Sequence, residues 1–266
     1  MTGTTATQAT ASANTGNPFP WAGQPDEAAC NYAFGLLLKS IPAQVMIENK
    51  LHAPTLMTAV GAVAGIAAQV SLLSDTEKMQ KATEDKKILE VKLKDGRTLM
   101  YGDALNEMLY SARDPKLAHA RLWNMLVSAA MSKGLDRAAL PNVPDMFKHV
   151  SESFGTAKEG FPSTPANAQP VMPVRDLLRF VGPVAVAALA GETRIPALAA
   201  GAPLRANRKS WVAITAQAGG HLLATAAQAM PPELCLTIAM ESAIYASKLR
   251  ANAPEADPAE APAPQA

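Results

Sequence analysis

The sequence predicts a mainly α fold: a single helical domain around a buried, Ala/Gly-rich central helix, with one small β-hairpin. Three observations predict it. Hydrophobic residues make up 48% of the 266 residues, whereas charged residues make up 18% and aromatic residues 5%, a balance that favours closely packed helices. The stretch 54–73 has no charged residue. Apolar residues elsewhere recur mostly at helical spacing, and one short segment alternates as a strand does.

The central helix, residues 54–73, has two unlike sides. Plotted at the helical period, its bulky residues gather on one side and its small or flat residues on the other. A helix that is apolar all round lies in a core or in a membrane. A flat Gly/Ala side lets another backbone approach closely, so Gly61 and Gly65 are the candidate residues for self-association.

Both ends of the chain are predicted to be disordered. Residues 27–252 between them are predicted to form the helical domain. Residues 1–26 are rich in Thr, Ala, Ser, Gly and Pro, and residues 253–266 in Pro, Ala and Glu, so neither tail can bury much apolar surface. Within the domain, the spacing of apolar residues predicts a helix over 27–50, which Pro42 kinks or divides.

The segment after the central helix changes period. Residues 75–87 carry mixed charges and predict an exposed helix end or a loop. Leu89, Val91 and Leu93 then alternate with charged residues, as in a half-buried strand. Asp95-Gly96 favours a tight turn, and residues 97–101 return as the partner strand. A lone hairpin is marginally stable, so we expect its apolar face to pack on the helices.

The rest of the chain predicts further helices joined by one long loop. The loop covers residues 158–173, which are rich in Pro, Ala, Asn and Ser. Gly219 and Gly220 cost their helix about 2 kcal/mol relative to alanine, so we expect a neighbouring helix to pack closely there. The helices are expected from Asp103, from Asp114 to Gly134, and over 144–154, 174–189 (bent or broken near Pro183), 208–230 and 231–248.

The last helix carries the sharpest polar signal in the sequence. Thr237, Glu241 and Lys248 fall within about 40° of one another, while apolar residues occupy most of the remaining circumference. A buried carboxylate needs a partner or a raised pKa. One interpretation is an acid–base pair of Glu241 and His221 in an apolar pocket between the last two helices, with Lys248 as a further ligand-binding residue. The other interpretation is a line of side chains that faces solvent.

Motifs for cofactors, metals or covalent catalysis are missing from the sequence. There is no GxGxxG or GxSxG segment, and the two cysteines, Cys30 and Cys235, form no CxxC motif. The histidines stand in four different segments without metal-ligand spacing: His52, His119, His149 and His221. We therefore expect no metal and no cofactor, and the sequence leaves enzymatic activity open.

Three classes of function follow. The first is a non-enzymatic binding or scaffold protein that self-associates or binds a protein partner. The second is a small-molecule-binding protein or enzyme with an apolar pocket between the last two helices, where a small apolar ligand is possible. The third is a membrane-associated protein that inserts helix 54–73, which has the right length but no flanking aromatic belt. A net charge of +1 argues against nucleic acid, and the N-terminal composition favours a cytoplasmic protein.

Overall fold

The computed structural model describes residues 19–110, 120–192 and 204–250 of the chain. Within these residues the protein has nine α-helices and two two-stranded antiparallel sheets, which confirms the predicted mainly α fold. The predicted helix start at Asp114 and the tail 253–266 lie outside the described residues, as does His119. The helix expected there is described from Leu122 onward.

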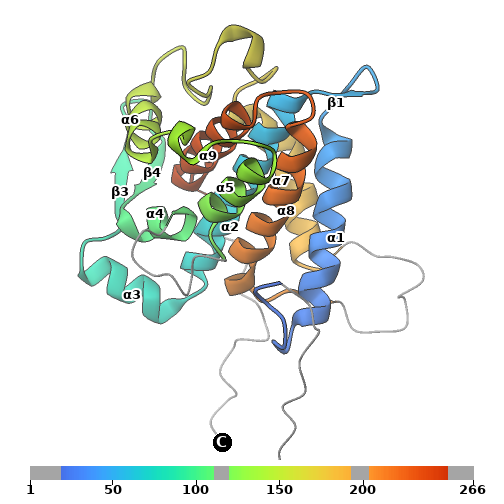
Figure 1. Ribbon diagram of the computed structural model, residues 1–266. Coiled ribbons are helices and arrows are strands. Elements are labelled where there is room, and N and C mark those ends of the chain that lie inside the picture. Colours follow the sequence, from blue (N-terminus) through green and yellow to red (C-terminus); the bar gives the residue numbers. More distant parts are fainter. Residues whose placement is uncertain (1–18, 111–119, 193–203, 251–266) are drawn as a thin grey trace, which may run out of the picture.

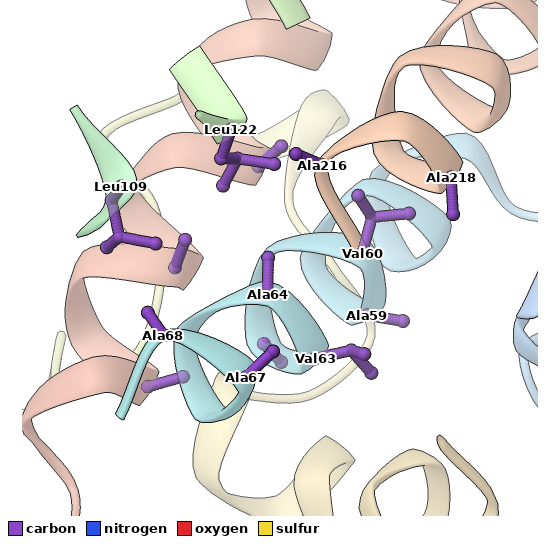
Figure 2. Packing of buried hydrophobic residues seen from close by; sticks show 14 of the residues in the cluster. Ala59, Val60, Val63, Ala64, Ala67, Ala68, Leu109, Leu122, Ala216 and Ala218 are labelled. Atoms are coloured by element: carbon purple, nitrogen blue, oxygen red, sulfur yellow. The ribbon is translucent and has the colours of Figure 1, made fainter. Parts of the chain in front are cut away.

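Helix α2 (Ala53–Leu73) runs through the middle of the molecule (Figure 1). Its neighbours are α9 (Pro232–Lys248), α8 (Trp211–Ala226), α7 (Val174–Leu189) and, at fewer positions, α1 (Glu27–Gln44). Of its 21 residues 19 are buried, and small and branched side chains interlock around it (Figure 2). The predicted central helix is therefore confirmed.

The flat side of α2 packs against α9 of the same chain. A Cβ atom built on Gly61 would lie 2.1 Å from the carbonyl oxygen of Ala239, and one on Gly65 would lie 2.5 Å from that of Ala243. The close approach of a second backbone is thus confirmed, but the second backbone belongs to α9. The prediction that Gly61 and Gly65 mediate self-association is wrong, because this face is already covered.

Helix α8 passes close to two other helices at its paired glycines. A Cβ atom on Gly219 would lie 3.1 Å from Cγ1 of Val60 in α2. One on Gly220 would lie 3.2 Å from the carbonyl oxygen of Met125 in α5 (Leu122–Ser132). Close packing of α8 against α2 and α5 therefore compensates for the low helix propensity of its two glycines, as the sequence predicted.

Two helices contain an internal proline and continue past it. Pro42 lies inside α1 and Pro183 inside α7, and both helices run on for further residues. Helix α1 nevertheless stops at Gln44, short of the predicted residue 50. A second, very short hairpin follows it, with β1 (Met46–Ile47) paired to β2 (Lys50–Leu51). The sequence analysis expected one hairpin only.

The other side of the molecule holds the larger hairpin and three further helices: α3 (Thr76–Glu84), α4 (Asp103–Leu109) and α6 (Val143–Ser153). Strand β3 (Leu89–Lys92) pairs with β4 (Thr98–Tyr101) in antiparallel register. Leu99 and Met100 of β4 are buried, and Leu99 also bridges Leu249 beyond α9.

Strand β3 is exposed along its whole length, contrary to the prediction of a half-buried strand. Leu89 is 53% and Val91 is 40% exposed. The reason is positional: β4 lies between β3 and the helices, so β4 alone supplies the buried apolar residues of the hairpin.

Residues 19–26 pack on the helices, although they were expected to belong to the disordered tail. The Trp21 side chain is 2% exposed, stacks on Phe19 at a centroid distance of 4.9 Å, and donates from Nε1 to the side-chain oxygen of Asn31. The two aromatic rings also contact Phe34 of α1. A short aromatic cluster is therefore enough to fix the segment that leads into α1.

Candidate functional site

One face of α9 is polar although 13 of the helix's 17 residues are buried. Glu241, Tyr245 and Lys248 lie at positions i, i+4 and i+7, which places them on the same side of the helix. Their exposed fractions are 2%, 2% and 3%. We call these three residues the polar face of α9. Their partners come from α6, from the segment 154–173 and from the β3–β4 hairpin, so the interpretation of a solvent-facing line is wrong.

The carboxylate of Glu241 is held by Ser163. The backbone N–H of Ser163 donates to Oε2 at 2.6 Å, and its hydroxyl donates to Oε1 at 2.5 Å. His149 Nε2 lies 3.8 Å from Oε2. Burial raises the pKa of Glu241, while the two hydrogen bonds and the nearby imidazole act in the opposite direction. Burial is the larger influence, so the pKa of Glu241 stays above its ordinary value.

The imidazole of His149 is oriented by the long loop. Its Nε2–H donates to the carbonyl oxygen of Phe161 at 3.1 Å, which leaves Nδ1 as the acceptor of the neutral ring. Nδ1 makes no hydrogen bond to the residues that the structure describes. The side chain is 25% exposed, so His149 connects the buried carboxylate to solvent.

His221 does not reach this site, so the predicted pair of Glu241 and His221 is wrong. His221 is exposed on α8, and its ring packs edge-on against Phe34 at a centroid distance of 5.3 Å. The prediction assumed that the two last helices face each other at Glu241. Instead Glu241 leaves α9 toward α6 and the long loop, while the neighbouring Ser242 faces Gly61 of α2.

A cleft of about 450 Å³ opens above Glu241. Its wall includes His149 and Ser163, the two residues that contact the carboxylate, so Glu241 lies just behind the floor of the cleft. The Oε1 atom of Gln169 is buried behind this wall without a hydrogen-bond partner in the described part of the chain. The lining residues are His149, Ala157, Lys158, Phe161, Pro162, Ser163, Thr164 and Gln169.

A second, much smaller cavity is lined by Glu241 itself. Its volume is about 10 Å³, close to the space that one water molecule needs. Glu241 and Ser242 line it, and Ser242 Oγ is buried without a partner among the described residues. Phe161 and Pro162 line both this cavity and the open cleft. Glu241 thus lines a water-sized cavity that shares two wall residues with the open cleft.

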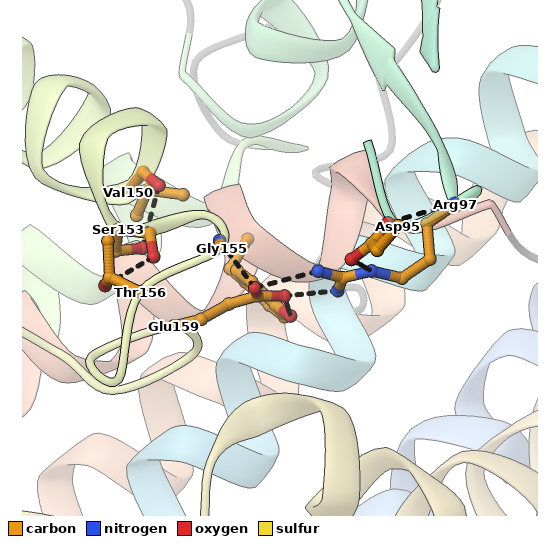
Figure 3. A network of polar contacts seen from close by, with 8 residues as sticks. Asp95, Arg97, Val150, Ser153, Gly155, Thr156 and Glu159 are labelled. Carbon is orange, nitrogen blue, oxygen red and sulfur yellow. Dashed lines mark hydrogen bonds and ion pairs between the residues drawn. The ribbon is translucent and has the colours of Figure 1, made fainter. Parts of the chain in front are cut away.

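The middle residue of the polar face ties the loop to the hairpin. The Tyr245 hydroxyl donates to Oε1 of Glu159 at 2.8 Å, and Arg97 from the hairpin binds both oxygens of the same carboxylate (Figure 3). The N–H of Gly155 donates to Glu159 as well. The guanidinium of Arg97 is the largest cause that lowers the pKa of Glu159 to about 2. This network fixes the start of the loop that carries Ser163.

Lys248, the third polar residue, lies among aromatic rings. Its ammonium is 4.4 Å from the centre of the Tyr101 ring and 5.8 Å from that of Phe147. No carboxylate among the described residues pairs with it, and burial lowers its pKa to about 8. Cation–π contacts of this kind stabilise a buried ammonium. Lys248 does not line the cleft above Glu241, so the structure separates it from that site.

Sequence reasoning found one part of this site and missed the rest. It singled out Glu241 from the polar line of an otherwise apolar helix. It missed His149, which it treated only as one of four scattered histidines. It also missed Ser163, which lies in the long loop, 78 residues from Glu241 along the chain. A useful signal was the buried carboxylate itself, because such a group requires donors from segments that are distant in sequence.

Among the described residues, no group of three or more His, Cys, Asp or Glu side chains is placed to hold a metal ion. Comparisons with protein-family models, curated proteins and solved structures give no match to this chain. The site must therefore be interpreted from its own geometry.

Proposed function

We propose that this protein binds a small molecule in the cleft above Glu241. The observation that carries the proposal is a buried carboxylate that contacts two residues of an open cleft wall and is held by a serine rather than by a lysine or arginine. A purely structural carboxylate at this depth would normally have a full cationic partner. The cleft volume lies within the range of ordinary ligand pockets, about 300–1,000 Å³.

The chemistry of the wall favours a ligand with an apolar body and a hydrogen-bond donor. Phe161 and Pro162 supply apolar surface. The hydroxyl of Ser163 is already given to Glu241, so Lys158 is the cationic donor of the wall and Nδ1 of His149 is an acceptor. A hydroxyl or amine on the ligand would find an acceptor in Nδ1 of His149.

A matched pair of probes tests this proposal: benzyl alcohol, which carries a donor, and toluene, which has the same ring without one. In amide NMR spectra we expect benzyl alcohol to shift the signals of His149, Ser163 and Gln169, and toluene to shift them less. A second cleft of about 400 Å³, which includes His52 and Ala229 in its wall, serves as the internal control. Equal shifts with both probes, or shifts confined to the second cleft, would contradict the proposal.

Binding to another protein chain is a second candidate function, and one observation favours it. Strand β3 carries the exposed apolar side chains Leu89 and Val91, and its outer edge has no strand partner among the described residues. The proposal of a protein partner or a homo-oligomer therefore moves from Gly61 and Gly65 to this edge. It does not exclude the cleft as a ligand site.

We also propose a cytoplasmic protein without a nucleic-acid or membrane partner. The free, buried thiols of Cys30 and Cys235 and the net charge of +1 support it. In the described part of the chain, α2 is the one helix that is long and apolar enough to cross a membrane. However, 89% of its apolar stretch is buried inside the protein. Its burial is what a core helix requires, and inserting it in a bilayer would mean unpacking α8 and α9 from it.

A further inference from the structure

Strand β3 presents an open edge whose sequence is complementary to itself. The hairpin places β3 at the periphery of the molecule, with β4 on its inner side (Figure 1). All four residues of β3 are exposed, so the fold itself covers neither their side chains nor the outer edge. An open edge of this kind is a template for pairing with another strand.

The hydrogen-bond pattern shows which backbone groups point outward. Leu93 donates its N–H to the carbonyl oxygen of Arg97, and Val91 stands opposite Leu99 in the same ladder. Hydrogen-bonded positions alternate along an antiparallel pair, so the odd-numbered residues of β3 face β4. The backbone N–H and C=O groups of Glu90 and Lys92 therefore point away from the hairpin.

We propose that two copies of this chain associate by antiparallel pairing of β3 with β3, centred on Val91. In this register, Glu90 of each copy lies opposite Lys92 of the other copy, which gives two pairs of opposite charges. Both residues direct their backbone N–H and C=O groups toward the partner strand. Val91 meets its own copy, and Leu89 meets Leu93. The five residues Leu-Glu-Val-Lys-Leu are thus complementary in charge and in hydrophobicity about their centre.

The neighbouring two-fold registers are unfavourable. Centring the pair on Glu90 would set two glutamates opposite each other, and centring it on Lys92 would set two lysines opposite each other. Neither Glu90 nor Lys92 forms an ion pair within the described part of the chain, so both are available for a partner. Opposite charges therefore favour the register centred on Val91 over its two neighbours.

A dimer held by one short strand from each copy is small. It falls below the size of standard stable interfaces, about 1,200 Å², so we expect an equilibrium between monomer and dimer that depends on concentration. The pairing forms one four-stranded sheet in the order β4–β3–β3–β4 and is independent of the cleft above Glu241.

Charge reversal gives the decisive test, with sedimentation velocity on the full chain as the measurement. Wild type should form dimers as its concentration rises. E90K alone sets lysine opposite lysine, and K92E alone sets glutamate opposite glutamate, so each should weaken the dimer about tenfold or more. An equimolar mixture of the two variants, or the double variant E90K/K92E, restores opposite charges and should restore the dimer.

The matched control is Lys39→Glu, an equal charge change at an exposed position of α1. We expect it to dimerise like the wild type. Because Glu90 and Lys92 are both exposed, all variants should keep the wild-type circular dichroism and melting temperature. A wild type that stays monomeric at every concentration, or dimers that persist unchanged in E90K, would overturn the proposal.

Discussion

Glu241 is held in the core by a serine, and this choice of partner has consequences for the dependence of stability on pH. Burial raises its pKa above the ordinary value of 4.5, so the folded protein binds this proton more tightly than the unfolded chain does. The stabilising effect of protonated Glu241 is complete below pH 4.5. It is lost as the pH rises from 4.5 toward the folded-state pKa, because the unfolded chain then releases a proton that the folded protein still holds.

The variant Glu241→Gln isolates this effect, since glutamine has similar size but does not titrate. We expect the free energy of unfolding of the wild type to fall relative to that of the variant as the pH rises above 4.5. Urea unfolding at a series of pH values measures the difference. A difference between the two proteins that does not change with pH would show that the carboxylate is not destabilised by burial.

Lys248 leads to a prediction of the same kind with the opposite charge. Its pKa is lowered from 10.5 to about 8, which corresponds to a cost on the order of 3 kcal/mol for burying the ammonium. The contact with the Tyr101 ring offsets up to about 2 kcal/mol of such a cost. We therefore expect Lys248→Met to raise the free energy of unfolding by about 1 kcal/mol at pH 7.

The pH dependence distinguishes this explanation from a simple packing effect. A lowered pKa means that wild-type stability rises between pH 8 and 10.5, where the unfolded chain still holds a proton that the folded protein has released. The advantage of Lys248→Met should shrink over this range in thermal or urea unfolding. A constant advantage up to pH 10.5, or a loss of stability at pH 7, would contradict the account of Lys248.

At the residue scale, the sequence identified the buried polar line but not its partners. Glu241 and Lys248 stand out because they interrupt an apolar helix, and that signal is local. The groups that satisfy them are not local: Ser163, His149 and Tyr101 come from a loop, another helix and a strand. His221 was chosen because it lies on the preceding helix, but chain proximity does not determine which face of α9 a helix covers.

The packing of α2 on α9 is the element on which the fold depends most. Alanine at position 61 would place a methyl group against the backbone of α9, 2.1 Å from the Ala239 carbonyl oxygen, so the helices would have to separate. We expect Gly61→Ala to lower the free energy of unfolding by about 2 kcal/mol or more, because strain outweighs the gain in helix propensity. Urea unfolding measures the change.

Gly35→Ala is the matched control for Gly61→Ala. Gly35 also lies inside a helix, α1, and a Cβ atom built there has no neighbour within 4 Å. The same substitution should therefore raise the free energy of unfolding by about 0.5–1 kcal/mol through helix propensity alone. A Gly61→Ala variant that gains stability as Gly35→Ala does would mean that α2 and α9 are not in close contact.

At the scale of elements, periodicity predicted most helices well and failed where neighbours decide. The alternation in Leu89, Glu90 and Val91 correctly predicted a strand, but it could not show that β4 would take the buried position. The flat face at Gly61 correctly predicted a close backbone contact, but not that α9, almost 180 residues away, would supply it. Pattern gives the type of an element, and packing gives its partner.

At the scale of the whole molecule, the cleft results from three elements that meet over α9. Helix α6 contributes His149, the loop contributes Phe161 and Ser163, and the network around Glu159 ties this loop to the hairpin. The sequence predicted the loop and the helices, but it placed a pocket between α8 and α9 instead. The composition of a Pro-rich loop does not reveal that its polar groups will satisfy a buried carboxylate.

Native mass spectrometry on the full chain, purified without detergent, tests the proposed ligand site most directly. We predict an additional mass that disappears when the protein is denatured. Ala157→Trp, which fills the cleft above Glu241, should abolish it, whereas Ala229→Trp, the same substitution in the second cleft, should retain it. A wild type that shows only the mass of the bare chain or its multiples, or a ligand mass that persists in Ala157→Trp, would contradict the proposal.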